Sequence, residues 1–137
     1  MLGIGTDIVE IERIREAVRK WGDRFLKKIF TEEEIAYCYK KKDPFPHLAV
    51  RFAAKEAVIK ALSTSTSEHL TQDTEARLKI SKLKDIEILN QPTGKPFVNL
   101  LGSLKTSYQD MFIIHLTLTH ERSHAIATVV VETESKT

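Results

Sequence analysis

Two carboxylates occur in segments where charged side chains are unexpected. Asp7 lies in the β-branched segment GIGTDIV of residues 3–9, and Glu56 lies in a helical segment that has little polar surface. Mg²⁺ binds hard oxygen ligands and commonly takes one or two carboxylates, with substrate phosphates and water completing its shell. If the two side chains converge, they form a magnesium site. Otherwise Asp7 is a cap or turn residue, and Glu56 forms a helical ion pair with Lys60.

Three further side chains are candidates for phosphate contacts. Lys60 follows Glu56 by one helical turn, so it could neutralise a phosphate oxygen or a developing negative charge instead of pairing with Glu56. His120 ends the alternating segment IIHLTLTH, where it faces either a cleft or solvent. Lys95 stands beside a turn in TGKP, and a solvated lysine is the alternative to a phosphate contact there.

Missing motifs exclude several common functions. The sequence has no GxxxxGK[ST] loop, no GxGxxG after a strand, no GxSxG elbow and no paired Cys/His spacing, which argues against nucleotide hydrolases, dehydrogenases and zinc proteins. The single cysteine, Cys38, lies in a predicted helix, where we expect a buried thiol. One cysteine, no secretory signal and no apolar run of about 18 residues indicate a cytoplasmic protein without a membrane span.

The elements that position these side chains fit into one domain. The chain has 137 residues, 42% of them hydrophobic, and a formal charge of +2. This size and composition predict a single domain over residues 1–137 that folds without disulfides.

The N-terminal half predicts three helices. Apolar residues with three-and-four spacing indicate an amphipathic helix from Ile11, with Gly22 as a weak point near its end. Thr31 and Glu34 have the spacing of a capping box for a helix over 32–39. The third helix, over 47–62, is apolar on two sides, so we expect protein around it. Its charged residues then need partners: Arg51, Lys55, Glu56 and Lys60.

A basic ridge is expected on the first helix. Residues 11–28 contain seven basic and three acidic residues, and this local excess favours an acidic partner, such as a nucleic acid, lipid headgroups or an acidic protein. A nucleic-acid surface would usually add exposed stacking aromatics, whereas Trp21 and Phe25 fall on the predicted core stripe. The ridge lies opposite that stripe and consists of Arg13, Lys20 and Arg24.

The C-terminal half predicts strands. A polar loop over 63–75 precedes a hairpin over 78–101 that turns at residues 91–94, followed by a short helix over 102–109. Two further strands, over 112–119 and 125–132, are joined by HERS. Helices followed by antiparallel strands favour an α+β fold, with N-terminal helices packed on a small antiparallel sheet.

Three segments together resemble the holo-acyl-carrier-protein synthase family of 4′-phosphopantetheinyl transferases. They are GIGTDIVEIERI over 3–14, RFAAKEAVIKAL over 51–62 and LTLTHERSHAIATVVVE over 116–132, and DIEI over 85–88 and GKP over 94–96 add support in the expected order. The resemblance implies transfer of 4′-phosphopantetheine from coenzyme A to a serine of apo acyl carrier protein, in support of fatty-acid biosynthesis, with release of adenosine 3′,5′-bisphosphate.

The resemblance also assigns roles to individual residues. It implies that Asp7 and Glu56 bind Mg²⁺ with the coenzyme A pyrophosphate, and that Lys60 neutralises the phosphates. Either Glu56 or a metal-associated water would deprotonate the serine. The acidic carrier protein would dock on the basic ridge, and the protein would be a homotrimer with active sites between subunits. The coenzyme would be bound by Arg51, Gly94, Lys95, Pro96 and His120.

Two segments depart from the family pattern. The family continues after KAL with a glycine-containing GTGI stretch, whereas this chain has Ser63, Thr64 and Ser65 and then a polar stretch to Glu75. Thr117 and Thr119 replace the serines that precede the family histidine at His120. Two alternatives to an active enzyme remain. The basic ridge allows a basic-surface binding module, and the altered loop allows an inactive relative that serves as an interaction subunit.

Overall fold

The computed structural model describes residues 2–65 and 83–133. The expected polar loop beyond Ser65 and the expected strand start at 78–82 lie outside the described residues. The elements are, in order, β1 (Leu2–Glu10), α1 (Ile11–Trp21), α2 (Asp23–Ile29), α3 (Glu32–Tyr39), α4 (Pro44–Ser65), η1 (Leu83–Asp85), β2 (Ile86–Asn90), β3 (Pro96–Leu100), α6 (Gly102–Leu104), η2 (Lys105–Gln109), β4 (Phe112–His120) and β5 (His124–Thr133).

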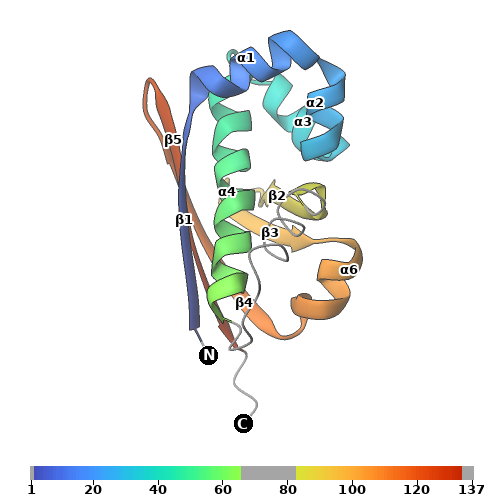
Figure 1. Cartoon of the computed structure of the whole chain (residues 1–137), viewed down its shortest axis with the longest axis vertical. Helices are drawn as coiled ribbons and strands as arrows, with labels where there is room; N and C mark the ends of the chain where they lie inside the picture. Colours follow the sequence, from blue (N-terminus) through green and yellow to red (C-terminus); the bar gives the residue numbers. More distant parts are fainter. Residues whose placement is uncertain (1, 66–82, 134–137) are drawn as a thin grey trace.

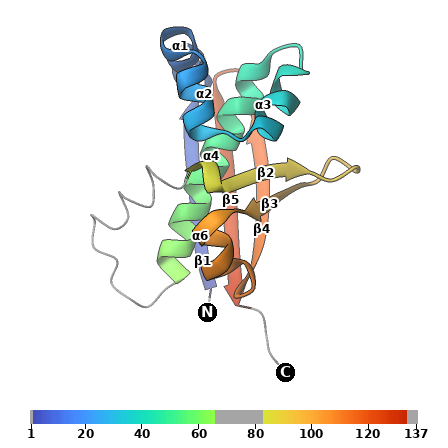
Figure 2. The same cartoon turned by 90° about the vertical axis from the view of Figure 1, so that its right-hand side faces the viewer.

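A three-stranded antiparallel sheet with the order β1-β5-β4 forms one layer, and the long helix α4 lies along it (Figure 1). The hairpin of β2 and β3 forms a separate two-stranded sheet beside α4 (Figure 2). In the larger sheet Asp7 is opposite Ala127, which is opposite Leu118 on the other side. The expected α+β fold is confirmed.

Two glycines let α4 approach β1 closely. A Cβ atom on Gly3 would lie 2.1 Å from the carbonyl oxygen of Ala61, and one on Gly5 would lie 2.1 Å from that of Ala57. Both distances are far below a van der Waals contact, so a side chain at either position would push the helix away. Asp7 follows Gly5 by two residues, and alternate residues of a strand share one face. The strand therefore presents Asp7 to the helix.

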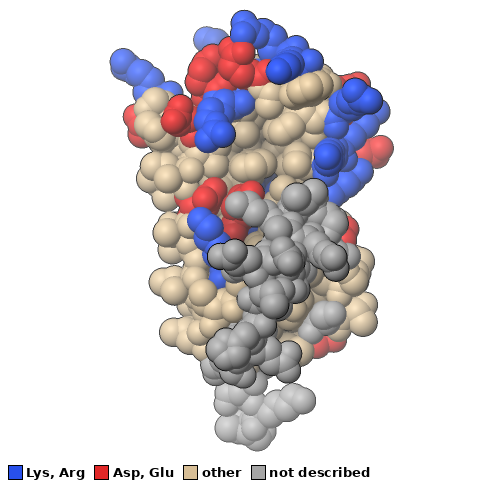
Figure 3. Space-filling view, viewed as in Figure 1, with Lys and Arg blue, Asp and Glu red and all other residues tan. Residues whose placement is uncertain are grey.

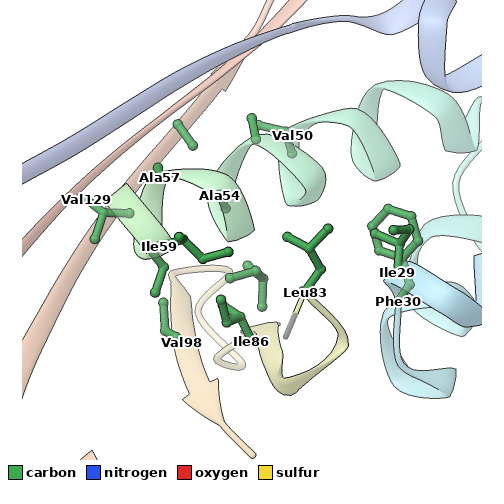
Figure 4. Close-up of a cluster of buried hydrophobic side chains, with 14 of the residues drawn as sticks. Ile29, Phe30, Val50, Ala54, Ala57, Ile59, Leu83, Ile86, Val98 and Val129 are labelled. Carbon is green, nitrogen blue, oxygen red and sulfur yellow. The ribbon is translucent and has the colours of Figure 1, made fainter. Parts of the chain in front are cut away.

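Helix α4 is buried on both sides, as its sequence predicts. Toward the sheet it packs small residues such as Ala57 near Val129, and toward the hairpin Ile59 packs near Ile86 and Val98 (Figure 4). The helix is longer than expected, because it begins at Pro44 and continues to Ser65. Proline is well suited to the first turn of a helix, where its missing N–H costs no hydrogen bond.

The charges of α4 have the partners that burial demands. Lys55 is fully buried, and its Nζ donates to Glu34 Oε1 at 2.8 Å and to the carbonyls of Leu83 and Ile86. Glu34 also accepts hydrogen bonds from two backbone amides, those of Thr31 and Ile88. Burial lowers the pKa of Lys55, and the Glu34 carboxylate opposes that shift. The network ties α3, α4 and β2 together.

The capping box of α3 is confirmed, but the single helix expected from Ile11 is wrong. Thr31 Oγ1 accepts from the amide of Glu34, whose carboxylate accepts from the amide of Thr31. Gly22 has a positive φ of 56°, which ends α1 and lets α2 begin in a new direction. Trp21 leaves the expected core stripe as a result and is 52% exposed.

The face of the sheet opposite α4 carries apolar side chains. Among the described residues, Leu2, Ile4 and Ile8 of β1 are 66%, 61% and 60% exposed, and Ile113 of β4 is 42% exposed. A patch of this kind on a sheet commonly marks an interaction surface. No helix in the described part of the chain is long and apolar enough to cross a membrane.

Candidate active site

Asp7 and Lys60 form an ion pair between β1 and α4. Lys60 Nζ lies 3.0 Å from Asp7 Oδ1 and also donates to the carbonyl of Thr6 at 3.0 Å. The side chain of Lys60 is 48% exposed and that of Asp7 is 18% exposed. The pair therefore remains open to an incoming ligand, unlike the pair that Lys55 forms.

Asp7 and Glu56 line one pocket of about 380 Å³, which we call the carboxylate pocket. Glu56 is only 6% exposed, so its carboxylate is held largely away from water. The structure thus brings together the two carboxylates that the sequence marked as unusual. The other lining residues come from β1, α1, α2 and α4: Ile8, Val9, Arg13, Ile14, Ala17, Phe25 and Phe52.

A second pocket of about 430 Å³, which we call the cation pocket, contains the predicted coenzyme residues. None of its described lining residues is acidic, so its charge complements an anion. The lining comes from α3, α4, β4 and the β2–β3 hairpin: Tyr37, His47, Val50, Arg51, Asn90, Gly94, Lys95, Pro96, Leu116, Thr117, Leu118 and His120.

Arg51 is the most constrained cation of this pocket. It is 2% exposed, donates to Asn90 Oδ1 at 2.6 Å and to the carbonyl of His47 at 3.2 Å, and places its guanidinium carbon 4.3 Å from the centroid of the Tyr37 ring. Its Nε is the one buried side-chain polar atom without a hydrogen-bond partner in the described chain. The positive charge is thus fixed in place without a carboxylate to neutralise it in these contacts.

The two pockets share none of their described lining residues. The structure therefore separates the predicted site into two halves within one chain. Asp7 and Glu56 are in one half, and Arg51, the Gly94–Lys95–Pro96 turn and His120 are in the other.

The predicted basic ridge is distributed over two places. Arg13 lines the carboxylate pocket, while Arg24 lines a neighbouring hollow formed with Trp21, Phe25 and Lys28, which we call the α1–α2 hollow. Lys20 Nζ lies 5.0 Å from the Trp21 ring centroid. Phe25 borders both the hollow and the carboxylate pocket. Basic side chains gather at the end of the molecule that α1 and α2 form (Figure 3).

The sequence alone did not identify Tyr37, His47 and Asn90 as pocket residues. His47 precedes Arg51 by four residues, so helical spacing places both on one face of α4 and could have indicated it. Tyr37 and Asn90 come from α3 and β2, and no local spacing connects those segments to Arg51.

The donor set of the carboxylate pocket fits a magnesium ion that shares its shell with a substrate. Two carboxylates line the pocket, and the described residues contain no group of three or more His, Cys, Asp or Glu that could hold a metal. An all-protein zinc or calcium cage needs more ligands, whereas Mg²⁺ usually takes one or two carboxylates and leaves positions for phosphates and water.

Comparison with known proteins gives a consistent family. Residues 3–129 match the family model of the 4′-phosphopantetheinyl transferase superfamily. The chain is 47% identical over 132 residues to the holo-[acyl-carrier-protein] synthase of Chlamydia muridarum, covering 96% of this chain and 95% of that protein.

Solved structures agree with this similarity. The Helicobacter pylori holo-[acyl-carrier-protein] synthase, solved with coenzyme A, is 31% identical with a TM-score of 0.72, and the match covers 94% of this chain and 99% of that one. The Bacillus anthracis holo-(acyl-carrier-protein) synthase, solved with coenzyme A (3′,5′-ADP), is 31% identical with a TM-score of 0.70, and the match covers 96% of both chains.

Proposed function

The chain belongs to the 4′-phosphopantetheinyl transferase superfamily, and on this premise we propose that it transfers 4′-phosphopantetheine from coenzyme A to a serine of apo acyl carrier protein. The observation that carries the proposal is the convergence of Asp7, Glu56 and Lys60 at the junction of β1 and α4. The serine Oγ forms a bond to the β-phosphorus as the bond from that phosphorus to the bridging oxygen breaks. Adenosine 3′,5′-bisphosphate leaves.

Asp7 and Glu56 are the residues that would hold Mg²⁺ with the coenzyme pyrophosphate. When bound, the ion supplies charge neutralisation on the phosphates that react. Lys60 is placed by its contacts to Asp7 and Thr6, and it neutralises negative charge as the leaving phosphate forms. The serine proton passes to the Glu56 carboxylate or to water, and phosphoryl transfer of this kind depends mainly on positioning and electrostatics.

The cation pocket takes the nucleotide end of coenzyme A. Arg51, Lys95 and His120 line it together with the Gly94 and Pro96 backbone of the hairpin turn. The φ of Gly94 is 92°, a left-handed conformation that favours glycine, and a Cβ there would meet nothing within 4 Å. This conformation at Gly94 lets the β2–β3 turn place Lys95 and Pro96 along the cation pocket.

The separation of the two pockets supports a site completed between subunits. One subunit would contribute the carboxylate pocket and its neighbour the cation pocket, in a cyclic homotrimer. The apolar face of the sheet, with Leu2, Ile4, Ile8 and Ile113 exposed, is a surface that assembly would cover.

The α1–α2 hollow is where the carrier protein would dock. It combines the exposed Trp21 ring with Arg24 and Lys28, and it shares Phe25 with the carboxylate pocket. Aromatic and arginine anchors are typical of binding hot spots, and an acidic partner would complement the basic side chains. A carrier protein docked there would hold its serine beside Asp7 and Glu56.

Intact-protein mass spectrometry tests the reaction. Apo acyl carrier protein is incubated with the protein, coenzyme A and Mg²⁺, and a parallel sample contains a chelator. We expect the carrier to gain the mass of one phosphopantetheine group, and the chelator to prevent the gain. A well-folded protein that leaves a competent carrier unmodified would support the inactive-relative alternative.

Mixed assemblies test whether the site is shared between subunits. Asp7→Asn and His120→Ala each disable a different half, so each variant alone should be inactive. When the two are co-expressed in equal amounts, about one quarter of the interfaces would join two intact halves, and transfer should return to that level. Continued inactivity of a confirmed mixed assembly would contradict a shared site, as would a monomeric mass with full activity.

The exposed Trp21 removes one argument against a nucleic-acid surface, because the ring is available for stacking beside Lys20. The family membership and the carboxylate pocket favour the transferase. A Glu56→Gln variant separates the two functions, since it should abolish transfer and leave any nucleic-acid affinity unchanged.

A further inference from the structure

His47 lines the cation pocket, and most of the charged groups around it disfavour a proton on its ring. Its ring centroid lies 5.6 Å from that of His120 and 6.5 Å from that of Tyr37, with near-perpendicular planes in both cases. Burial lowers the pKa of His47, and the positive charges of Arg51, His120 and Lys41 lower it further, while Asp43 opposes them. In the free protein these influences together favour the neutral form of the His47 ring.

An anion in the pocket reverses this balance. Arg51 is fixed by Asn90 and by the His47 carbonyl, so it cannot swing away from a ligand without breaking those bonds. A phosphate beside Arg51 would offset the positive charges that disfavour a proton on His47. An opposite charge within a few ångströms favours the charged form of a histidine.

Coenzyme A has one group suited to this pocket. Its pyrophosphate carries single charges on each phosphorus and is assigned to the carboxylate pocket by the proposed function. Its 3′-phosphate is a phosphomonoester, which approaches a charge of −2 near neutral pH and offers three acceptor oxygens. The lining of the cation pocket, with Arg51, Lys95 and His120 and no described carboxylate, matches such a dianion.

We propose that His47 is a further phosphate-binding residue of the cation pocket, which takes up a proton from solvent when the 3′-phosphate of coenzyme A enters beside Arg51. This inference rests on the proposed function, because it assumes that the nucleotide end of coenzyme A occupies this pocket. Proton uptake by His47 makes the affinity for coenzyme A depend on pH. It also lets the pocket distinguish coenzyme A from dephospho-coenzyme A, which lacks the charged 3′-phosphate.

Histidine-selective NMR titrations test the proposal directly. The His47 ring signal is assigned by its loss in His47→Gln and followed from pH 5.5 to 8.5 in the free protein, with saturating coenzyme A and with saturating dephospho-coenzyme A. We expect coenzyme A to raise the pKa of His47 by about one unit or more, and dephospho-coenzyme A to leave it unchanged. His124, which begins β5 and does not line the pocket, is the internal control.

Binding measurements give the matching energetic result. A rise of one pKa unit favours coenzyme A binding by up to about tenfold at low pH, so His47→Gln should weaken binding by up to that factor at pH 5.5 and hardly at all at pH 8.5. His124→Gln should change neither value. If coenzyme A binds and the pKa of His47 does not move, the inference is wrong and the proposed function stands. If coenzyme A does not bind at all, both fail.

Discussion

Two lysines on one helix make ion pairs with opposite consequences. Lys55 and Lys60 are five residues apart on α4, and each contacts a carboxylate on another element at 2.8 Å and 3.0 Å respectively. Both members of the Lys55–Glu34 pair are fully buried, whereas Lys60 is 48% exposed and Asp7 is 18% exposed. Contact distance alone does not distinguish the two pairs, but burial and the remaining hydrogen bonds do.

The difference shows which of the two lysines can meet a ligand from solvent. Lys55 and Glu34 together contact four backbone groups of the surrounding elements, so a ligand could replace none of these contacts without opening the fold. Lys60 contacts one carbonyl besides Asp7 and borders solvent. An ammonium group that reaches solvent and makes fewer contacts with the protein, as Lys60 does, can bind a phosphate.

Removing one member of the buried pair should have the largest effect. Lys55→Met leaves the Glu34 carboxylate buried without its cation, and we expect a loss of about 3–5 kcal/mol of unfolding free energy. Urea denaturation of the variant and the parent protein measures this. A loss below about 1 kcal/mol would show that the Lys55–Glu34 pair does not stabilise the fold.

Removing the exposed lysine should affect transfer instead. Lys60→Ala should reduce kcat/KM for transfer about 100-fold, because the developing phosphate charge loses one neutralising group. Its unfolding free energy should change by at most about 1 kcal/mol, as expected for a partly exposed pair. A loss of unfolding free energy in Lys60→Ala as large as that in Lys55→Met would contradict this difference between the two lysines. A normal transfer rate for Lys60→Ala would contradict it as well.

Docking of the carrier protein should depend on side chains away from both lysine pairs. We expect Trp21→Ala and Arg24→Glu each to raise KM for the carrier about tenfold with little change in kcat, which corresponds to about 1.4 kcal/mol. Added salt should weaken carrier binding to the parent protein and to Trp21→Ala more than carrier binding to Arg24→Glu. The matched charge reversal is Lys84→Glu on η1, which should leave KM unchanged. An equal rise in KM for Arg24→Glu and Lys84→Glu would rule out a specific docking surface.

The smallest expected effect is on the pH dependence of stability. Since the folded state lowers the pKa of His47, the unfolded state binds the proton more readily, and stability should fall as pH decreases through the ordinary histidine range. This loss should be absent in His47→Gln, because glutamine does not titrate in this range. Thermal melts from pH 5 to 8 measure it, and an unchanged slope in the variant would contradict it.

Local signals in the sequence predicted the parts of the fold that depend on neighbouring residues. Thr31 and Glu34 cap α3 as their spacing indicates, and the charges of α4 have partners because a helix apolar on two sides would otherwise bury them alone. The same signals could not give Trp21 its exposed position, since its direction depends on whether the chain turns at Gly22. A glycine in a helical pattern allows both outcomes.

The sequence named residues that line pockets in the structure, but it did not show how they divide between two pockets. The resemblance implies active sites between subunits but not which residues lie together in one chain, and the fold places Asp7 and Glu56 in one pocket and Arg51 and His120 in another. The sequence also could not identify Glu34 as the partner of Lys55, because residues 21 positions apart meet only when α3 packs on α4.

The most direct test of the account measures transfer and stability together in Glu56→Gln. The substitution keeps the shape of the side chain and removes its charge from the carboxylate pocket, and Glu32→Gln on the exposed first turn of α3 is the matched control. We predict no phosphopantetheine gain on the carrier with Glu56→Gln, an undiminished melting temperature, and normal transfer with Glu32→Gln. Transfer by Glu56→Gln at a rate near that of the parent protein would contradict the assignment of this pocket as the reaction site.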